Sequence, residues 1–509
     1  MFLRPLLLVL LGTQTISCVS AADAAKPNII VILADDVGFG DLGCYGATLV
    51  KTHALDRLAA EGCRFTDAHS PAATCTPTRR ALLTGGYSWR QEAGSSIAPG
   101  DAPITIQPGT VTLPSLLKQA GYRTGIVGKW HLGLGGQGGP DWNGEIKPSP
   151  LDIGFDSSFI MAATGDRVPC VFIDQRRVAN LDPADPITVS YKNKIGTDPT
   201  GAENPELLKL KHTLGHDRTI VNGVGRIGWM SGGKAARWRD EDMADTFAAQ
   251  AIKFLETPGD APFFLLFTPH GIHVPRVPNE RFVGSSPLGA RGDAIQELDD
   301  TVSRVLAAVE KKGQSANTLV IFTSDNGGVW DDGYADHGPQ GTHRINGALR
   351  GTKGTLFEGG HRVPFIARWP GKIKPGTESS ALISSVDFPA TFAALTNVPL
   401  PADAAPDSFN ILPALTGEST TARTSAFFHV GGTQGPLALR MGSWKYIQAG
   451  RGGSGKAAAP DAGDAPKPKL YDLGKDPAET HDLAAELPDK LREMAAFTQA
   501  ARAGSRTRP

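Results

Sequence analysis

The sequence predicts an α/β fold, with a large, mostly parallel central sheet flanked by helices and a smaller C-terminal antiparallel sheet subdomain. Short apolar runs typical of buried parallel strands alternate with segments of helical spacing. Residues 401–509 instead hold short strand-like runs separated by brief turns. The chain has 509 residues, of which 40% are hydrophobic and 20% charged, which is typical of a globular protein with a substantial core.

The main domain, which we place at residues 26–400, contains the alternating strands and helices. Short apolar runs predict strands at 28–34, 125–128, 263–267 and 318–322. Apolar residues recurring on one face predict helices at 55–60, 113–120, 243–255 and 295–309. Gly62, Gly121 and Gly313 follow three of these helices and are plausible stops.

The C-terminal subdomain, at residues 401–509, is predicted to be a small antiparallel sheet. Its strands are expected at 425–430, 437–441, 444–447 and 469–471. The stretch 450–468 is rich in Gly, Ala and Pro with scattered charge, so we expect a mobile loop there.

The N-terminus has the order of residues found in a secretory signal peptide, which we place at 1–22. Arg4 precedes an apolar run at 6–11, and small residues follow at 20–22. We therefore expect an exported protein, periplasmic or secreted, with lipoprotein anchoring through Cys18 as a less favoured alternative. No other apolar run reaches the ~18 residues needed to cross a bilayer, so no membrane span is expected.

Charge and cysteine content exclude two further classes. Lys and Arg number 51 against 52 Asp and Glu, a net charge of −1, which argues against a non-specific nucleic-acid binder. Loss of Cys18 with the signal leaves four of the five cysteines, too few for a disulfide scaffold. One bridge among Cys44, Cys63 and Cys170 stays open, whereas Cys75 is better reserved for chemistry.

Polar residues follow each predicted strand of the main domain. The clusters are Asp35-Asp36, Lys129 with His131, His270 with His273, and Asp325-Asn326. In open α/β sheets, ligands bind outside the carboxyl ends of the strands. A single such cluster is most simply a strand-ending turn. Four at the same structural position favour a functional site.

The acidic clusters indicate a metal site. Adjacent carboxylates such as Asp35 and Asp36 repel one another, and burying them is costly unless a cation neutralises them. Asp325 and Asn326 add further oxygens. An all-oxygen set suits Ca²⁺ or Mg²⁺ better than Zn²⁺, and Ca²⁺ is preferred because it accepts irregular geometry.

A second local signal surrounds Cys75. Pro77 suits the first turn of a helix that Arg79 to Leu83 continue, which places Cys75 at the helix N-terminus. Free N–H groups there favour an anion, but the helix dipole contributes only about 0.3–1 kcal/mol. Arg79, Lys129 and Lys353 would have to supply most of the attraction for a multiply charged substrate. A buried structural cysteine and a low-pKa nucleophile are the alternatives.

These segments resemble a known family. Cys75-Thr-Pro-Thr-Arg79 resembles the Cys-x-Pro-x-Arg signature of type I (formylglycine-dependent) sulfatases, arylsulfatase-like enzymes of the alkaline phosphatase superfamily, and the match extends through Leu82-Leu-Thr-Gly85. Five further blocks are similar in the same order: Asp35-Asp36, Gly121–His131, Asp325–Gly327, Gly351–Gly360 and Leu470–Pro477. One such block is weak support, but the ordered set is specific.

The resemblance implies a chemistry for Cys75. In such enzymes a maturation enzyme oxidises the cysteine to formylglycine, whose hydrate carries two hydroxyls on one carbon. One hydroxyl attacks sulfur and displaces the alcohol. The second then loses its proton, sulfate leaves, and the aldehyde returns. A serine or a thiol would be left as a stable ester.

The resemblance also implies the role of each residue. Asp35, Asp36, Asp325 and Asn326, with an oxygen on residue 75, would bind the cation. Arg79 would orient the hydrated aldehyde, and Lys129 and Lys353 would hold sulfate oxygens. His131 would accept the second hydroxyl proton. His273 and Lys353 are the candidates for protonating the leaving oxygen, with His270 as a support for its loop.

The expected activity is hydrolysis of sulfate esters, with a sulfated carbohydrate or a small sulfate ester as substrate. A phosphate or phosphonate ester hydrolase of the same superfamily is the alternative, and a carbohydrate-binding protein without activity is a third hypothesis. Asp166-Arg167 could reach the substrate. The segment 226–239, with Arg226, Trp229, Lys234, Arg237, Trp238 and Arg239, suits either an anionic sugar or a solvated loop anchored by tryptophans.

Overall fold

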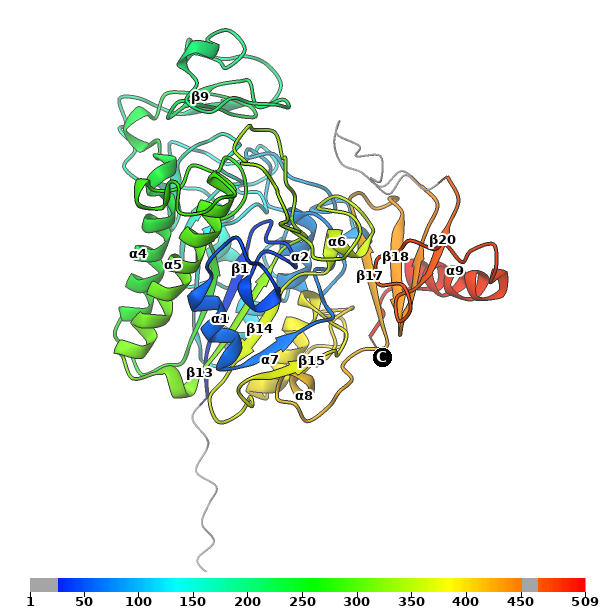
Figure 1. Ribbon diagram of the computed structural model, residues 1–509. Helices are drawn as coiled ribbons and strands as arrows, with labels where there is room; N and C mark the ends of the chain where they lie inside the picture. The colour runs from blue at the N-terminus through cyan, green and yellow to red at the C-terminus, as the bar shows by residue number, and fades with distance from the viewer. Residues whose placement is uncertain (1–25, 451–465, 509) are drawn as a thin grey trace, which may run out of the picture.

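The computed structural model describes residues 26–450 and 466–508. The predicted signal peptide at 1–22 lies outside the described residues, as does most of the predicted mobile loop, at 451–465. Elsewhere the α/β prediction is confirmed: a large mixed, mostly parallel sheet lies between helices, and a small antiparallel sheet follows it (Figure 1).

The four predicted strands of the main domain form the centre of the sheet. They are β1 (Asn28–Ala34), β4 (Arg123–Lys129), β12 (Phe263–Thr268) and β13 (Thr318–Ser324). Their order is β13-β1-β12-β4, and every neighbouring pair is parallel. Their carboxyl ends therefore meet at one edge, as the site prediction requires.

Shorter strands, which the sequence did not reveal, extend this sheet on both sides. The full order is β15-β2-β14-β13-β1-β12-β4-β5-β6-β7. The added strands are β2 (Cys63–Phe65), β5 (Ser157–Met161), β6 (Phe172–Asp174), β7 (Arg177–Val178), β14 (Phe365–Arg368) and β15 (Thr377–Ser379). β14 pairs antiparallel with β13 and with β2, and β6 pairs antiparallel with β5, whereas the edge pair β15-β2 is again parallel, so the sheet is mixed outside its parallel centre.

Helices cover both faces of the sheet. They are α1 (His53–Ala60), α2 (Cys75–Thr84), α3 (Leu113–Gln119), α4 (Met243–Glu256), α5 (Ala290–Lys311), α6 (Glu358–His361), α7 (Phe388–Thr396) and α8 (Leu412–Leu415). The rings of Phe263 and Phe254 of α4 are in contact, as are those of Phe264 and Phe392 of α7. Because successive strand residues point to opposite faces, α4 and α7 lie on opposite sides.

The C-terminal subdomain is a four-stranded antiparallel sheet, as predicted. Its strands are β17 (Ser425–His429), β18 (Leu437–Met441), β19 (Trp444–Ile447) and β20 (Lys469–Asp472). A terminal helix that the sequence analysis did not anticipate, α9 (Pro488–Ala503), packs on this sheet, and Met494 is its buried residue in the apolar core there (Figure 1).

Smaller pairings complete the described residues. β3 (Ala68–His69) pairs with β16 (Ile383–Ser384), β8 (Thr188–Ser190) with β11 (Trp229–Ser231), and β9 (Ile220–Val221) with β10 (Val224–Gly225). The four described cysteines are free thiols.

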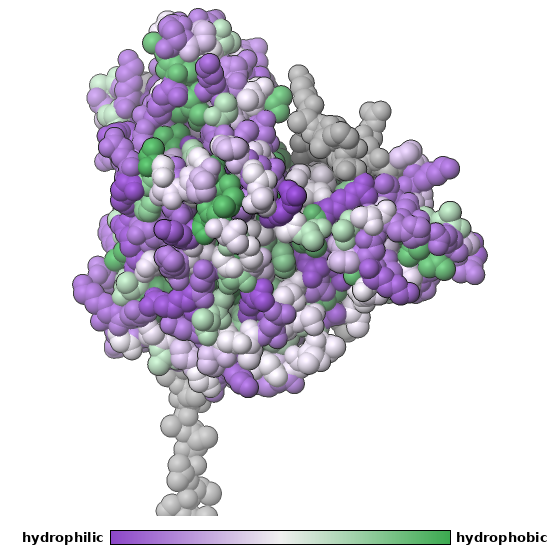
Figure 2. All heavy atoms as spheres, in the orientation of Figure 1, coloured by the Kyte–Doolittle hydropathy of each residue, from purple (hydrophilic) through white to green (hydrophobic). Residues whose placement is uncertain are grey.

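Within residues 26–450 and 466–508, no helix combines the length and apolar composition needed to cross a bilayer. Figure 2 shows a mainly hydrophilic face on which apolar residues are scattered.

Candidate active site

The two acidic pairs lie side by side because their strands do. β1 and β13 are parallel neighbours, with Ala34 opposite Ser324. Asp35-Asp36 and Asp325-Asn326 directly follow these positions, and all four residues are fully buried. The chain turns sharply at Asp36, whose φ is 63°, and the amide of Asp36 lies 3.4 Å from Oδ1 of Asp325.

This carboxylate cluster is suited to a hard divalent cation. Oxygens of Asp35, Asp36 and Asp325 lie within 4.8 Å of one another. Among the described residues, Asp35 Oδ1 and Asn326 Oδ1 are buried without a hydrogen-bond partner. Burial and the charge of Asp325 raise the pKa of Asp35 to about 8 despite the nearby Lys129. A bound Ca²⁺ or Mg²⁺ would give these buried oxygens a partner and would favour the ionised form of the carboxyl, so the residues present fit such a cation.

Three cations surround the carboxylates. Lys129 Nζ lies 2.6 Å from Asp35 Oδ2, and Lys353 Nζ lies 2.9 Å from Asp36 Oδ2. Arg79 contacts Asp325 Oδ2 at 2.8 Å and also donates to the carbonyl of Lys129. When all three carboxyls are ionised, as a bound cation requires, their charges are balanced by the three positive side chains. A divalent cation can then enter together with two negative charges on substrate and nucleophile without changing the net charge of the pocket.

Cys75 is the first residue of α2, as the sequence predicts, and its side chain is buried. Burial raises the pKa of its thiol, although Lys129 and Lys353 act in the opposite direction. A buried thiol with a raised pKa is a poor nucleophile at neutral pH, so the low-pKa alternative is not favoured. Ala73, two residues before Cys75, is held from two sides, because its carbonyl accepts from the amide of Gly354 and its amide donates to the carbonyl of His429 of β17. The C-terminal sheet thereby positions Cys75.

His131 is neutral and presents a free ring nitrogen. Its Nε2 lies 2.9 Å from the carbonyl of Ala98, so that nitrogen carries the proton, and Nδ1 is buried with no partner among the described residues. Burial and the charges of Lys129 and Arg167 hold its pKa well below the usual range. The Thr76 hydroxyl, next to Cys75, donates to the carbonyl of His131 at 3.1 Å. His131 therefore has an unprotonated, buried Nδ1, and its backbone is hydrogen-bonded to the residue that follows Cys75.

His273 is also neutral, with its proton on the other nitrogen. Nδ1 donates to the carbonyl of Val274 at 2.7 Å, while Nε2 faces Asp36 and Asp332 at 3.9 Å. Burial, Lys353 and Lys129 hold its pKa well below the usual range. His270 instead accepts from the amide of Gly165 at 2.9 Å, the loop-supporting role expected for it.

Asp332 is the site residue that sequence reasoning missed. Its carboxylate accepts from Lys353 Nζ at 2.7 Å and is 35% exposed, so it lies between Lys353 and solvent. Desolvation opposes the charge of Lys353, but Asp332 and Asp36 outweigh it and raise the pKa of Lys353 well above its usual value. In the sequence, Asp331-Asp-Gly333 reads only as a turn, and nothing distinguishes it from other loops.

The residues proposed near the substrate divide into two groups. Arg167 pairs with Asp166, and Asp166 also contacts His216 at 3.1 Å. Cys75 is near enough to Arg167 to interact with its charge, so Asp166 and Arg167 lie beside the pocket that contains Cys75. In the segment 226–239, by contrast, Arg226 is buried against Asp240.

The rest of that segment is largely structural. Trp238 packs on Phe172, and Arg237 pairs with Asp198. Trp229 is stacked by Arg218 at 4.1 Å. The anchored-loop interpretation therefore describes these side chains better than the sugar-binding one.

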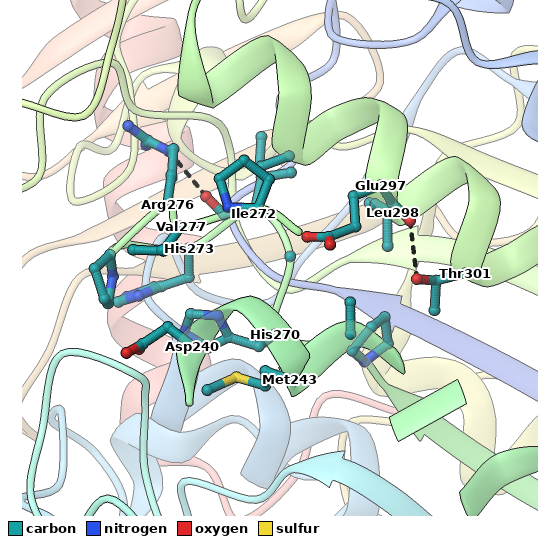
Figure 3. A pocket seen from close by; sticks show the side chains of 16 residues that line it. Asp240, Met243, His270, Ile272, His273, Arg276, Val277, Glu297, Leu298 and Thr301 are labelled. Carbon is teal, nitrogen blue, oxygen red and sulfur yellow. Dashed lines mark hydrogen bonds between the residues drawn. The ribbon is translucent and has the colours of Figure 1, made fainter. Parts of the chain in front are cut away.

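A small cavity of about 40 Å³ lies behind the histidine loop, as Figure 3 shows. Its walls come from the loop 269–278 and from α5, which contributes Glu297, Leu298 and Thr301. Arg276 donates to the carbonyl of Ile272 across the loop. Neither Cys75 nor the clustered carboxylates of Asp35, Asp36 and Asp325 line it, so the cavity supports the position of His273 and is not the reaction centre.

Comparisons with known proteins agree with this geometry. The family model described as Sulfatase matches residues 27–398. The chain is 48% identical over 485 residues to N-acetylgalactosamine-6-O-sulfatase of Bacteroides thetaiotaomicron, covering 93% of this chain and 92% of that protein. It is 34% identical over 493 residues to arylsulfatase A of Homo sapiens, covering 93% and 87%. A solved structure from work on the metabolism of multiple glycosaminoglycans by Bacteroides thetaiotaomicron superimposes with a TM-score of 0.90 at 46% identity, covering 94% of this chain and all of that one.

Proposed function

Because this chain belongs to the sulfatase family and is a sulfuric ester hydrolase, we propose that it acts on a sulfated carbohydrate and that it uses a formylglycine formed at Cys75 beside a bound divalent cation. The observation that supports this best is the meeting of Asp35, Asp36 and Asp325 with three buried cations at one sheet edge. The proposal keeps the catalytic domain at residues 26–400.

The cation is assigned to Asp35, Asp36, Asp325 and Asn326, with Ca²⁺ preferred and Mg²⁺ as the alternative. When bound, it would supply the charge that polarises the sulfate oxygens and the nucleophilic hydroxyl. Arg79 holds Asp325 in place through contacts at 2.8 and 2.9 Å. An aldehyde hydrate at position 75 supplies the nucleophile and allows sulfate to leave without a stable ester remaining.

The other residues bind sulfate and move protons. Lys129 and Lys353 hold sulfate oxygens, since both ammonium groups converge on the carboxylate cluster. His131 accepts the proton of the second hydroxyl at Nδ1, the ring nitrogen without a partner. Of the two candidates for protonating the leaving oxygen, Lys353 is preferred, because it is protonated and His273 Nε2 is not.

For the substrate we propose the 6-O-sulfate of N-acetylgalactosamine in a glycosaminoglycan-like carbohydrate. The proposal rests on the relative of that name, which shares 48% identity over 485 residues with this chain. We further propose that the protein is exported, to the periplasm or outside the cell, where a large anionic polymer is accessible, and that a formylglycine-generating enzyme matures it.

Mass spectrometry of the peptide containing Cys75 tests the nucleophile. Conversion to formylglycine, together with loss of turnover in Cys75→Ala, is the expected result. An unmodified thiol in fully active protein would refute the aldehyde. A substrate panel of 6-O- and 4-O-sulfated N-acetylgalactosamine, 6-O-sulfated N-acetylglucosamine and phosphate mono- and diesters tests the substrate. Fastest turnover of any other member would overturn the 6-O-sulfated galactosamine assignment.

A further inference from the structure

Arg80 is a buried cation whose guanidinium has no partner among the described residues. It is only 7% exposed, and its Nε is buried without a hydrogen bond. No ion pair or side-chain hydrogen bond joins its guanidinium to any residue within 26–450 or 466–508. Nη1 and Nη2 are not among the buried atoms, so they stay accessible to solvent from the cavity that Arg80 lines, and the charge they carry has no carboxylate bound to it.

The other buried arginines of the described chain show how unusual this is. Each has a carboxylate oxygen within 2.9 Å. The pairs are Arg79–Asp325, Arg226–Asp240, Arg276–Asp336, Arg291–Asp41, Arg368–Glu61, Arg423–Asp387 and Arg440–Glu358. In the part of the chain that the structure describes, every buried guanidinium except that of Arg80 therefore has a carboxylate counter-charge.

Arg80 lines an open cavity of about 340 Å³ behind α2. One water needs roughly 10–15 Å³ of such space, so the cavity has room for a polyatomic ion with its hydration. The walls come from α2 with the turn after it, from residues 109–111 and from residues 403–406. Cys75 and the carboxylate cluster do not line it. It is therefore a second site on the helix that carries the catalytic cysteine.

Among the charged side chains that line this cavity, Arg80 is the cation whose charge no carboxylate balances. Arg90 also lines it, but Asp407 holds Arg90 through two contacts of 2.7 Å. Asp403 is the carboxylate in the lining, and it is exposed and forms no ion pair with Arg80. Burial lowers the pKa of Arg80 to about 10, so the guanidinium remains charged at neutral pH.

We propose that this cavity binds a small tetrahedral oxyanion, inorganic sulfate or phosphate, through the guanidinium of Arg80. A planar guanidinium donates two parallel hydrogen bonds to two oxygens of such an ion. Sulfate is also the product of the hydrolase, so the bound ion would link product concentration to the stability of α2, the helix that holds Cys75 and Arg79.

The experiment is a titration of the full-length mature protein with sodium sulfate against sodium chloride at equal ionic strength, by calorimetry and thermal unfolding. All proteins carry Lys129→Met, which removes a sulfate contact in the reaction centre. Arg80→Met is compared with Arg239→Met, a matched loss of charge at a mostly exposed arginine. We expect sulfate to bind at least about tenfold more weakly to Arg80→Met, the loss of one charge-assisted contact. Equal binding by both variants would overturn the proposal.

Two controls keep the outcome clear. Without sulfate, Arg80→Met should unfold at the same or a higher temperature, because it removes an unpaired buried charge. If Arg80→Met instead greatly lowers the unfolding temperature, Asp403→Asn lowers it equally and the double variant lowers it no further, then Asp403 is the counter-ion of Arg80. That result would refute an oxyanion site. In crystals grown without sulfate and soaked in selenate, an anomalous peak beside Arg80 is expected. An anomalous peak in the reaction centre alone would contradict the site. Titration with a sulfated disaccharide distinguishes binding of the free ion from binding of the sulfate group of a substrate.

Discussion

Replacing Lys353 with Met most directly tests the proton donor. Lys353 Nζ bridges Asp36 at 2.9 Å and Asp332 at 2.7 Å, and these two carboxylates keep it protonated. His273 donates its own proton to the carbonyl of Val274, so its Nε2 has none to give. If Lys353 protonates the departing oxygen, its loss should matter most when that oxygen belongs to a poor leaving group.

The expected magnitude follows from this arrangement. A positioned general acid contributes on the order of 10²- to 10⁴-fold, and a single buried donor to developing charge is worth about 2.7–4 kcal/mol. We therefore expect kcat/KM of Lys353→Met on 6-O-sulfated N-acetylgalactosamine to fall roughly 10²- to 10³-fold. On 4-nitrophenyl sulfate the fall should be about tenfold smaller, because nitrophenolate departs without needing a proton.

The assay is steady-state kinetics on both substrates, with His273→Gln and Asp332→Asn as matched variants. The kcat/KM of His273→Gln should fall by a similar factor on both substrates. Asp332→Asn should change KM, while the ratio of its rates on the two substrates should change less. If His273→Gln shows the larger loss on the sugar and Lys353→Met loses equally on both substrates, the proton donor is His273 and the reasoning from tautomer and charge is wrong.

Three further results are expected. Chelation, or Asp325→Ala, should abolish turnover while circular dichroism stays native, and unchanged rates after complete cation removal would contradict the metal site. The pKa of Asp35 is raised to about 8 in the folded state, so the unfolded chain releases this proton at lower pH than the folded chain does. The free energy of unfolding of the metal-free protein should therefore fall as pH rises from about 4 to 8. Stabilisation by Ca²⁺ should grow over the same window, since binding requires the carboxylate, and thermal shifts at pH 6 and pH 8 measure it. Lys445 of β19 contacts Glu358 at 2.8 Å and Glu479 at 3.3 Å in a fully buried cluster. Lys445→Met should therefore lower the free energy of unfolding, measured by urea titration, by about 3–5 kcal/mol, and adding Glu358→Gln should restore part of it. A loss below about 1 kcal/mol would show that the cluster is hydrated.

The sequence predicted those parts of the fold that depend on long, regular patterns. The apolar runs at 28–34 and 318–322 are found as β1 and β13, and the helix over 295–309 is found as α5. β2 and β7 escaped detection because strands of three and two residues are too short for a periodic signal. The helix α9 was missed because few of its side chains are buried, so its apolar spacing is weak.

The candidate site was predictable where chemistry and chain order coincide. Two acidic pairs after two apolar runs lie together because parallel neighbours share an edge. Asp332 had no such signal, since its role depends on contact with Lys353 across a loop. The segment around Arg226 and Trp238 was compatible with a binding surface in sequence, yet both of these side chains are buried, because composition does not report which side of a loop faces solvent.

The sequence by itself determined the kind of protein and its reactive groups. Strand and helix periodicity is local, and the residues around Cys75 and the acidic pairs are read directly from chain order. Only the tertiary structure decided which groups are ionised and which nitrogen of each histidine carries a proton, and that Arg80 alone among the buried arginines of the described residues has no carboxylate. Protonation and pairing depend on burial and on charges brought from distant parts of the chain, and those distances exist only after folding.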